Sequence, residues 1–303
     1  MAMKKGISLI FMVMFFTTNL FAQVFYKIEG NGLEKPSYIF GTHHMAPITI
    51  VDAYDLNNYI NQSDQVIGEI DMTQGPMAIA MSMQSHMLAP ADSTLSKVIP
   101  AEKYDDVNEQ LKKFAPMPGI DLTMLEPMKP AAVSNMITVG IMAQLMPEFN
   151  MENQLDSYFQ TYAQENGKKI VGLETPEFQA QLLFDFTPIS VQVEGLLEVL
   201  EDPEKMIETA KKLNAAYLEG DLDALLALTN EEDSNSEFTI ALLDNRNANW
   251  LELLPDLMNE TPSFIAVGAL HLAGDKGVIE GLRKKGYTVE SIPMLQPVEI
   301  AEP

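Results

Sequence analysis

Four short runs of apolar residues stand out along the chain, and each ends at or beside a glycine. Runs that are apolar at successive positions are typical of strands covered on both faces, as in an α/β protein. Two further runs, at 24–28 and 287–292, predict strands nearer the sheet edges. The four central runs are residues 38–40 before Gly41, 65–67 before Gly68, 169–171 before Gly172 and 264–267 before Gly268.

Most of the remaining chain predicts helix. We therefore expect an α/β fold with a central mixed β-sheet flanked by helices. Residues 73–165 hold several helices between the second and third central strands, and we expect this helical insertion to form a cap within a single domain of residues 23–303. The predicted helices are 51–62, 76–88, 102–114, 126–145, 151–166, 176–184, 190–199, 203–218, 222–229, 236–253 and 275–285.

The N-terminus has the pattern of a secretory signal. Lys4 and Lys5 precede an apolar run over residues 7–16, and Ala22 offers a small residue at the expected cleavage point. The run is too short to span a bilayer. Residues 1–22 are therefore predicted to be a signal peptide, with an uncleaved anchor as the alternative. We expect the mature protein to be periplasmic or secreted and to have no membrane segment.

Composition removes several classes of function. The 303 residues carry a formal net charge of −24, which repels nucleic acid and anionic membrane surfaces. The chain has no cysteine, so disulfides, thiolate catalysis and Cys-ligated metals are excluded. We find no Gly-x-Ser-x-Gly, no phosphate-binding loop, no His-Glu-x-x-His and no dinucleotide fingerprint. The expected partner is a peptide or a small-molecule substrate.

Two Gly-x-x-His segments end predicted strands, one at His44 and one at His271. With 17 glycines and four histidines in 303 residues, chance gives only about 0.2 such matches. Ligands bind at the carboxyl ends of strands in α/β sheets, where glycine allows a close backbone approach. The pair therefore predicts a shared site, against the alternative of two unrelated structural histidines.

Two glutamates and an arginine complete the candidate site. Glu69 and Glu174 each follow a strand directly, and imidazole with carboxylate is a competent ligand set for Zn, Mn, Co or Fe. The same residues also act without metal when Glu is a general base oriented by His. Arg246, one of two arginines, is a candidate to stabilise an oxyanion or clamp a substrate carboxylate. Its alternatives are stacking on Trp250 and pairing with an acid.

These residues together resemble the TraB/PrgY/GumN family, which includes the TIKI-type proteases. The resemblance rests on the segments 40–44, 67–69, 171–175, 244–250 and 267–274 and spans roughly residues 25–295. It implies a fold of the erythromycin-esterase/ChaN-like group. In the TIKI branch it implies a metal-dependent protease supported by Mn or Co. Applied to this sequence, the resemblance implies that His44, His271 and Glu69 carry the chemistry. It implies that Glu174 and Arg246 are further pocket residues.

The sequence thus predicts a metal-dependent hydrolase, in particular a peptidase. His44, His271, Glu69 and Glu174 would bind Mn, Co or Zn, and Glu69 would be ligand or general base. One departure from the family is His43, which leaves open whether His43 or His44 is the functional histidine. Two other readings also stay open: a haem-, metal- or peptide-binding module without turnover, and a metal-independent, esterase-like hydrolase.

Overall fold

The computed structural model describes residues 23–115, 119–146, 154–233 and 236–298, so the predicted signal peptide lies outside the described residues. All six predicted strands are present. They are β1 (Phe25–Glu29), β2 (Ser37–Thr42), β3 (Gln65–Gly68), β4 (Lys169–Gly172), β5 (Ser263–Gly268) and β6 (Thr288–Ser291).

The strands form one mixed sheet in the order β4-β3-β5-β2-β1-β6. Neighbours from β4 to β2 pair in parallel, whereas β1 runs antiparallel to both β2 and β6. The expected α/β fold with a mixed central sheet is therefore confirmed. Four parallel strands side by side place their carboxyl ends along one edge of the sheet, where a ligand site is expected.

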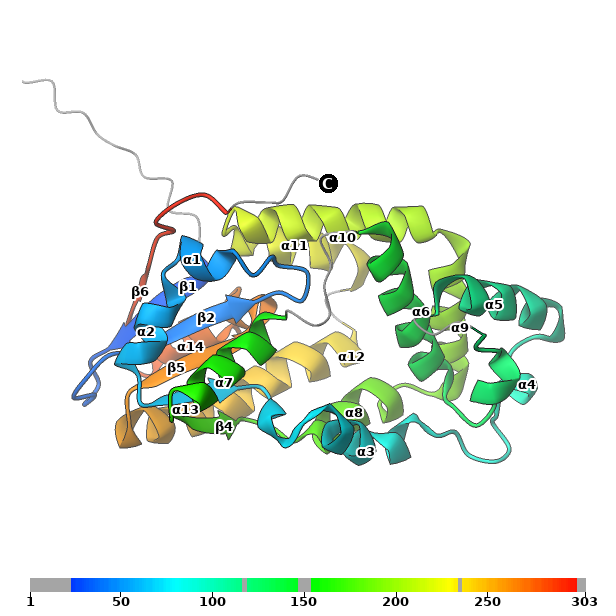
Figure 1. Cartoon of the computed structure of the whole chain (residues 1–303), viewed down its shortest axis with the longest axis horizontal. Coiled ribbons are helices and arrows are strands. Elements are labelled where there is room, and N and C mark those ends of the chain that lie inside the picture. The colour runs from blue at the N-terminus through cyan, green and yellow to red at the C-terminus, as the bar shows by residue number, and fades with distance from the viewer. Residues whose placement is uncertain (1–22, 116–118, 147–153, 234–235, 299–303) are drawn as a thin grey trace, which may run out of the picture.

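Helices occupy more of the chain than strands do (Figure 1). The α-helices are α1 (Ile50–Ala53), α2 (Leu56–Gln62), α3 (Pro76–Met87), α4 (Leu95–Val98), α5 (Ala101–Phe114), α6 (Pro130–Leu145), α7 (Leu155–Glu165), α8 (Pro176–Asp185), α9 (Ile189–Glu201), α10 (Pro203–Leu218), α11 (Leu222–Asp233), α12 (Glu237–Thr239), α13 (Asn245–Glu260) and α14 (Val278–Lys284). Short 3-10 turns are η1 (Met72–Gln74), η2 (Leu122–Leu125) and η5 (Ala269–Leu272), and η4 (Ile240–Asp244) is a π-helical turn.

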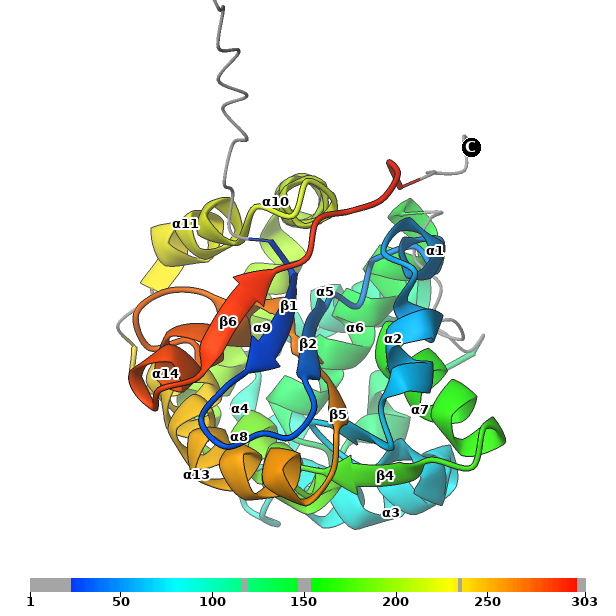
Figure 2. The ribbon, with the colours of Figure 1, turned by 90° about the vertical axis from the view of Figure 1, so that its left-hand side faces the viewer.

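Helices cover both faces of the sheet. Figure 2 shows α1, α2 and α7 on one side and α13 and α14 on the other. The strands are apolar at successive positions because both faces are covered, and side chains such as Ile39, Phe264 and Ile265 are fully buried. Strand β4 differs from this expectation. It is an edge strand with an exposed Lys169, because only β3 pairs with it.

A second hydrophobic core lies away from the sheet. It is formed by α4, α5 and α6 together with α9 and α10, around residues such as Val107, Ile137 and Leu196. Figure 1 shows this helical part on the right and the sheet on the left, with α10 extending along both. Of the predicted insertion, α7 packs on β3, β4 and β5 instead of on the helical part. The boundaries proposed for a cap at 73–165 stay a prediction.

Three predicted helices differ in detail from the observed ones, each for a local reason. The helix predicted at 51–62 is split into α1 and α2 by Asp55, whose φ of +53° is left-handed. The one predicted at 126–145 begins only at Pro130, because proline disfavours helix in the residue before it. The one predicted at 236–253 is interrupted by η4 and then continues through Pro255 to the end of α13.

Candidate active site

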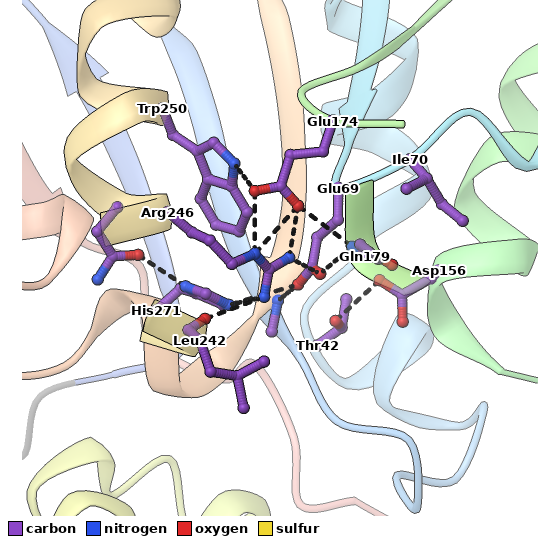
Figure 3. A network of polar contacts seen from close by, with 12 residues as sticks. Thr42, Glu69, Ile70, Asp156, Glu174, Gln179, Leu242, Arg246, Trp250 and His271 are labelled. Carbon is purple, nitrogen blue, oxygen red and sulfur yellow. Dashed lines mark hydrogen bonds and ion pairs between the residues drawn. The ribbon is translucent and has the colours of Figure 1, made fainter. Parts of the chain in front are cut away.

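The parallel strands bring the predicted site residues to one edge of the sheet. Thr42 at the end of β2 pairs in register with Gly268 at the end of β5, and Gly68 of β3 pairs with Gly172 of β4. The segments that follow these strands carry His44, His271, Glu69 and Glu174. Figure 3 shows that Glu69, Glu174 and His271 meet around Arg246, which comes from the first turn of α13.

Arg246 is the centre of this network. Its Nε donates to Glu174 at 2.9 Å, and its Nη2 donates to Glu69 at 2.6 Å and to Glu174 at 2.8 Å. Its Nη1 donates to the Leu242 carbonyl at 3.1 Å and lies 3.0 Å from Nε2 of His271. A guanidinium has five N–H donors. These contacts engage all five, so none is left for an oxyanion or a substrate carboxylate.

The structure shows both of the structural roles considered for Arg246, stacking on Trp250 and pairing with an acid. The guanidinium carbon lies 4.9 Å from the ring centroid of Trp250, and the side chain is paired with two acids. Burial alone would lower the pKa of Arg246, but Glu174 and Glu69 raise it above its ordinary value. The geometry corrects the predicted oxyanion role, because Arg246 holds Glu69, Glu174 and His271 in place instead of presenting a free donor.

Glu174 lies behind the cavity and is saturated with donors. Besides Arg246, it accepts from Trp250 Nε1 at 2.9 Å and from Gln179 Nε2 at 3.3 Å. Its side chain is only 6% exposed, and it is not among the residues that line the cavity between Glu69 and His271. Glu174 therefore supports the site from within the protein.

Glu69 is the carboxylate that reaches the cavity, with its side chain 23% exposed. Its Oε1 accepts from the Gly268 amide at 2.9 Å, and its Oε2 accepts from Gln179 at 3.1 Å. A Cβ on Gly268 would lie 3.3 Å from Oε1, so glycine permits this close approach. Burial raises the pKa of Glu69, but His271, Arg246 and the Gly268 amide together hold it below its ordinary value. Glu69 is thus an ionised carboxylate.

His271 is buried, and its partners fix its tautomer. Nδ1 lies 2.7 Å from Asn247 Oδ1, which is an acceptor, so Nδ1 carries the proton and Nε2 accepts from Arg246. Burial lowers the pKa of His271 to about 4. The ring packs on Trp250 with the centroids 4.3 Å apart. His271 is therefore a neutral imidazole with its Nε2 lone pair already in use.

The two histidines after β2 differ in their surroundings. The His43 ring packs against Tyr217 at 5.1 Å, and its Nε2 is buried without a hydrogen-bond partner. Burial lowers the pKa of His43 to about 4, with a smaller contribution from His44. The side chain of His44 is 75% exposed, and its Nδ1 lies 4.0 Å from Oδ2 of Asp156. Both histidines line the main cavity.

Asp156 is the site residue that sequence reasoning missed. It lies in the first turn of α7, and Figure 3 shows it beside Glu69 and Thr42. Its Oδ1 accepts from Thr42 Oγ1 at 2.9 Å, whereas its Oδ2 is buried and has no hydrogen-bond partner. Burial raises the pKa of Asp156 above its ordinary value. An acid in a first helical turn is common, so the sequence held no signal that distinguished it.

Two cavities meet at Glu69. The larger of these two, here called the main cavity, has a volume of about 370 Å³, and the smaller one, of about 120 Å³, lies toward α7. Both are also lined by His44 and Gln179. The wall of the main cavity opposite the polar groups is apolar, formed by Leu182, Leu183, Leu213, Leu225, Leu242, Leu243 and Leu270.

The four predicted metal ligands do not form one donor group. Among the described residues, no three His, Asp or Glu side chains are spaced to hold a single ion. The reason is Arg246, a cation that already contacts Glu69, Glu174 and His271 and would repel a metal placed among them. Nδ1 of His44 lies 4.0 Å from Oδ2 of Asp156, a residue outside that cluster. The predicted set therefore does not fit one ion in this arrangement.

His86, the remaining histidine of the chain, lies in α3, away from this site. Its Nδ1 pairs with Asp185 of α8 at 2.5 Å, and its Nε2 lies 4.0 Å from Glu177. The contact joins two helices that pack together, which gives His86 a structural explanation. No helix within the described residues is long and apolar enough to cross a membrane.

The sequence profile that describes the TraB/PrgY/gumN family matches residues 24–291. Curated relatives include the zebrafish (Danio rerio) proteins metalloprotease TIKI1 and metalloprotease TIKI2. Each is 24% identical to this chain, over 88% and 87% of it and over 63% and 60% of their own lengths. The metalloprotease TIKI homolog of Amphimedon queenslandica is 23% identical over 90% of this chain and 62% of its own length. The chain thus spans less than two thirds of each relative. No solved structure matches it.

Proposed function

The chain belongs to the TraB/PrgY/gumN family, and on that premise we propose that it is a metal-dependent hydrolase, more narrowly a peptidase, acting in the cavity beside Glu69. The observation that carries the proposal is Glu69 itself. It is an ionised carboxylate at the meeting point of two cavities, held by Arg246, Gln179 and the Gly268 amide. The relatives named metalloproteases supply the reaction class.

The chain's own groups divide the work around Glu69. Each carboxylate oxygen can accept more than one hydrogen bond, so Glu69 is able to orient a water or a substrate amide while its protein donors stay in place. His44 exposes its ring to both cavities, where an imidazole transfers protons between water and a leaving amine. A divalent cation such as Mn, Co or Zn, when bound, supplies Lewis-acid activation of the carbonyl and of water.

The apolar wall supports a peptide with a large apolar side chain as substrate. Seven leucines line a cavity of about 370 Å³, large enough for an aliphatic or aromatic side chain beside the scissile bond. An apolar pocket of this kind discriminates by about 1–3 kcal/mol per methylene. We therefore expect Leu, Phe or Met near the cleaved bond to be preferred over Gly or Asp.

Export remains part of the proposal. The basic and apolar pattern of residues 1–22 supports a cleaved signal peptide and a periplasmic or secreted product. N-terminal sequencing of the mature protein tests this, and a product that begins at Met1 would contradict it.

The test of the function is a metal-stripped protein reloaded with Mn²⁺, Co²⁺ or Zn²⁺ and offered a mixture of peptides. We expect cleavage only after reloading, and loss of cleavage in His44→Ala and Glu69→Gln. His86→Ala is the matched control, because His86 lies at a helix contact and lines neither of the two cavities at Glu69. No cleavage with any of the three ions would overturn the proposal, and a bound but uncleaved peptide would favour a binding module.

A second candidate is a metal-independent, esterase-like hydrolase. The observation that favours it is the direct contact of Arg246 with both Glu69 and His271, which makes a Glu–Arg–His group that is complete within the protein. Full activity in the presence of a chelator, with ester substrates cleaved faster than peptides, would support this candidate over the first.

A further inference from the structure

From the series of cavities that meets at Glu69, we infer that the substrate is an internal segment of a longer peptide. It lies extended along a groove that continues on both sides of Glu69, and one end of the groove takes a basic side chain. The inference rests on the proposed function for the peptide bond to be cleaved, and it adds the class of peptide.

Four cavities adjoin one another in a fixed order. A cavity of about 470 Å³ between α3 and α7, here called the α3–α7 cavity, shares Met72 and Gln160 with the smaller cavity at Glu69. The smaller cavity meets the main cavity at Glu69. The main cavity shares Leu213 with a cavity of about 600 Å³ between α6, α9 and α10, here called the α10 cavity. Glu69 therefore has one outer cavity on each side of it.

The two outer cavities lie at opposite ends of this series. Figure 1 shows α3 at the bottom of the view and α10 at the top. The segment after β2 joins the parts, because Met45 lines the α10 cavity and the preceding His44 lines both cavities at Glu69. A ligand that follows the whole series must be long and extended, as a peptide chain is.

The α3–α7 cavity is lined by uncharged groups. Its α7 side carries Ser157, Gln160, Thr161 and Gln164, which lie on one face of the helix because their spacing is three or four residues. Hydroxyl and amide groups both donate and accept, as recognition of a peptide main chain requires. From Ser157 to Gln164 the helix rises by about 10 Å, the length of about three extended residues.

The opposite wall of the α3–α7 cavity is apolar. It comes from α3 and includes Ile79, Ala80 and Met83. Side chains of an extended peptide point alternately to opposite sides, so one set contacts an apolar wall while the main chain contacts polar groups. This end of the groove therefore suits a peptide segment without charged side chains.

The α10 cavity differs in charge. Its described lining holds three carboxylates, Glu198, Glu201 and Asp202, and one ammonium, Lys205, for a formal charge of 1 − 3 = −2. A lysine or arginine of the substrate suits such a cavity, because its aliphatic stem packs on apolar walls while its charged end stays at the acidic rim. The apolar walls are flexible methionines, Met45, Met142 and Met206.

The first experiment measures binding without turnover. The probes are labelled peptides of about twelve residues, blocked at both termini, with Lys near each end and Leu, Phe or Met at the centre. An N-methylated central bond prevents cleavage, and fluorescence anisotropy gives the affinity. We expect binding at least tenfold tighter than that of the central four residues alone, because the outer cavities add contacts. Equal affinities would overturn the inference and leave the proposed function standing.

A matched pair of variants tests the α10 cavity. Glu198→Lys and Glu194→Lys change exposed glutamates four residues apart on α9, but only Glu198 lines the cavity. We expect Glu198→Lys to bind the long peptide at least fivefold more weakly and to narrow its preference for Lys over Glu near the ends. Glu194→Lys should bind like the wild type. Equal weakening in the two variants would show a general charge effect and overturn the basic subsite.

A second pair tests the α3–α7 cavity. Thr161→Trp narrows it, whereas Glu165→Trp places the same ring one turn further along α7 and outside the four cavities. We expect only Thr161→Trp to weaken binding of the long peptide, with no change for the central four residues. Equal binding by both variants would overturn this end of the groove. Circular dichroism establishes that each variant is folded.

Cleavage products separate the inference from the proposed function. The same long peptides without the N-methyl group are offered to metal-loaded protein, and mass spectrometry identifies the products. We expect cuts inside the blocked chain. Release of single terminal residues, from unblocked peptides only, would overturn the inference and leave a hydrolase. Wild-type protein that neither binds nor cleaves the long peptides would overturn both.

Discussion

The two sides of Glu69 differ in how their buried polar groups are satisfied. On one side, Arg246 uses all five N–H donors, and Glu174 accepts from three different side chains. On the other side, Asp156 Oδ2 is buried with no hydrogen-bond partner. One carboxylate, Glu69, belongs to both.

This difference separates the residues that hold Glu69 in place from those that are available to a ligand. A saturated network has nothing left to offer a ligand, and it fixes the geometry of the groups at its border. Unsatisfied groups carry a desolvation cost that a ligand can remove by binding. The Arg246 side therefore holds Glu69 in place, and the Asp156 side leaves a buried oxygen available to a ligand.

The largest expected effect on stability comes from removing Arg246, the centre of the fully hydrogen-bonded network. Arg246→Ala leaves Glu69 and Glu174 without the cation that pairs with both, and breaking a buried ion pair in this way costs about 3–5 kcal/mol. The free energy of unfolding by urea measures the effect. The control is Arg283→Ala, the other arginine, which pairs with Glu280 on the surface and should cost about 1 kcal/mol or less. Equal losses in the two variants would contradict the account.

The next effect is a loss of stability in acid. The pKa of buried His271 is about 4, below its ordinary value of 6.5, so the unfolded chain binds the proton first as pH falls. Stability from His271 is therefore present above pH 6.5 and is lost between about 6.5 and 4, by roughly 3 kcal/mol. Urea unfolding of metal-free protein across this range measures it. His271→Gln should depend less steeply on pH, and an unchanged dependence would show that His271 is not the group responsible.

Glu174→Gln has a smaller effect, because it removes one charge and keeps the shape of the side chain. Charged hydrogen bonds contribute about 1.5–3 kcal/mol each, so we expect a loss of about 2–3 kcal/mol in the free energy of unfolding. Glu177→Gln, an exposed glutamate on the neighbouring α8, is the control and should change stability by about 0.5 kcal/mol or less. A Glu174→Gln protein as stable as this control would mean that Glu174 does not anchor Arg246.

Asp156→Asn has the smallest expected effect on stability. The substitution removes the charge of a carboxylate whose Oδ2 has no hydrogen-bond partner, and it keeps the oxygen that accepts from Thr42. We expect the metal-free protein to change by less than about 1 kcal/mol in either direction. A loss as large as that of Glu174→Gln would place Asp156 in the supporting network and erase the contrast between the two sides.

Much of the fold could be predicted from the hydrophobic pattern. The apolar runs ended by Gly41, Gly68, Gly172 and Gly268 gave the parallel strands, because buried strands need no alternation. The breaks in the helices were not visible, since the left-handed turn at Asp55 depends on local packing and not on composition. The edge position of β4 also depends on strand order, which an apolar run does not encode.

The sequence predicted most of the residues of the site, but it did not predict which of them would contact one another. Strand ends placed Glu69, Glu174 and His271 together, as their order in the sheet requires. The sequence included Arg246 in the candidate site but could not show that it would pair with both glutamates, because Glu174 and Glu69 lie 72 and 177 residues from it along the chain. Asp156 was missed for a similar reason, since its partner Thr42 is 114 residues distant.

The most direct test is to locate a bound ion in a crystal of the protein soaked with Mn²⁺, by anomalous diffraction. We expect a peak beside Glu69, in the cavities that Glu69 and His44 both line, with the Arg246–Glu174 pair intact. A peak between Glu174 and His271, with Arg246 displaced, would contradict it.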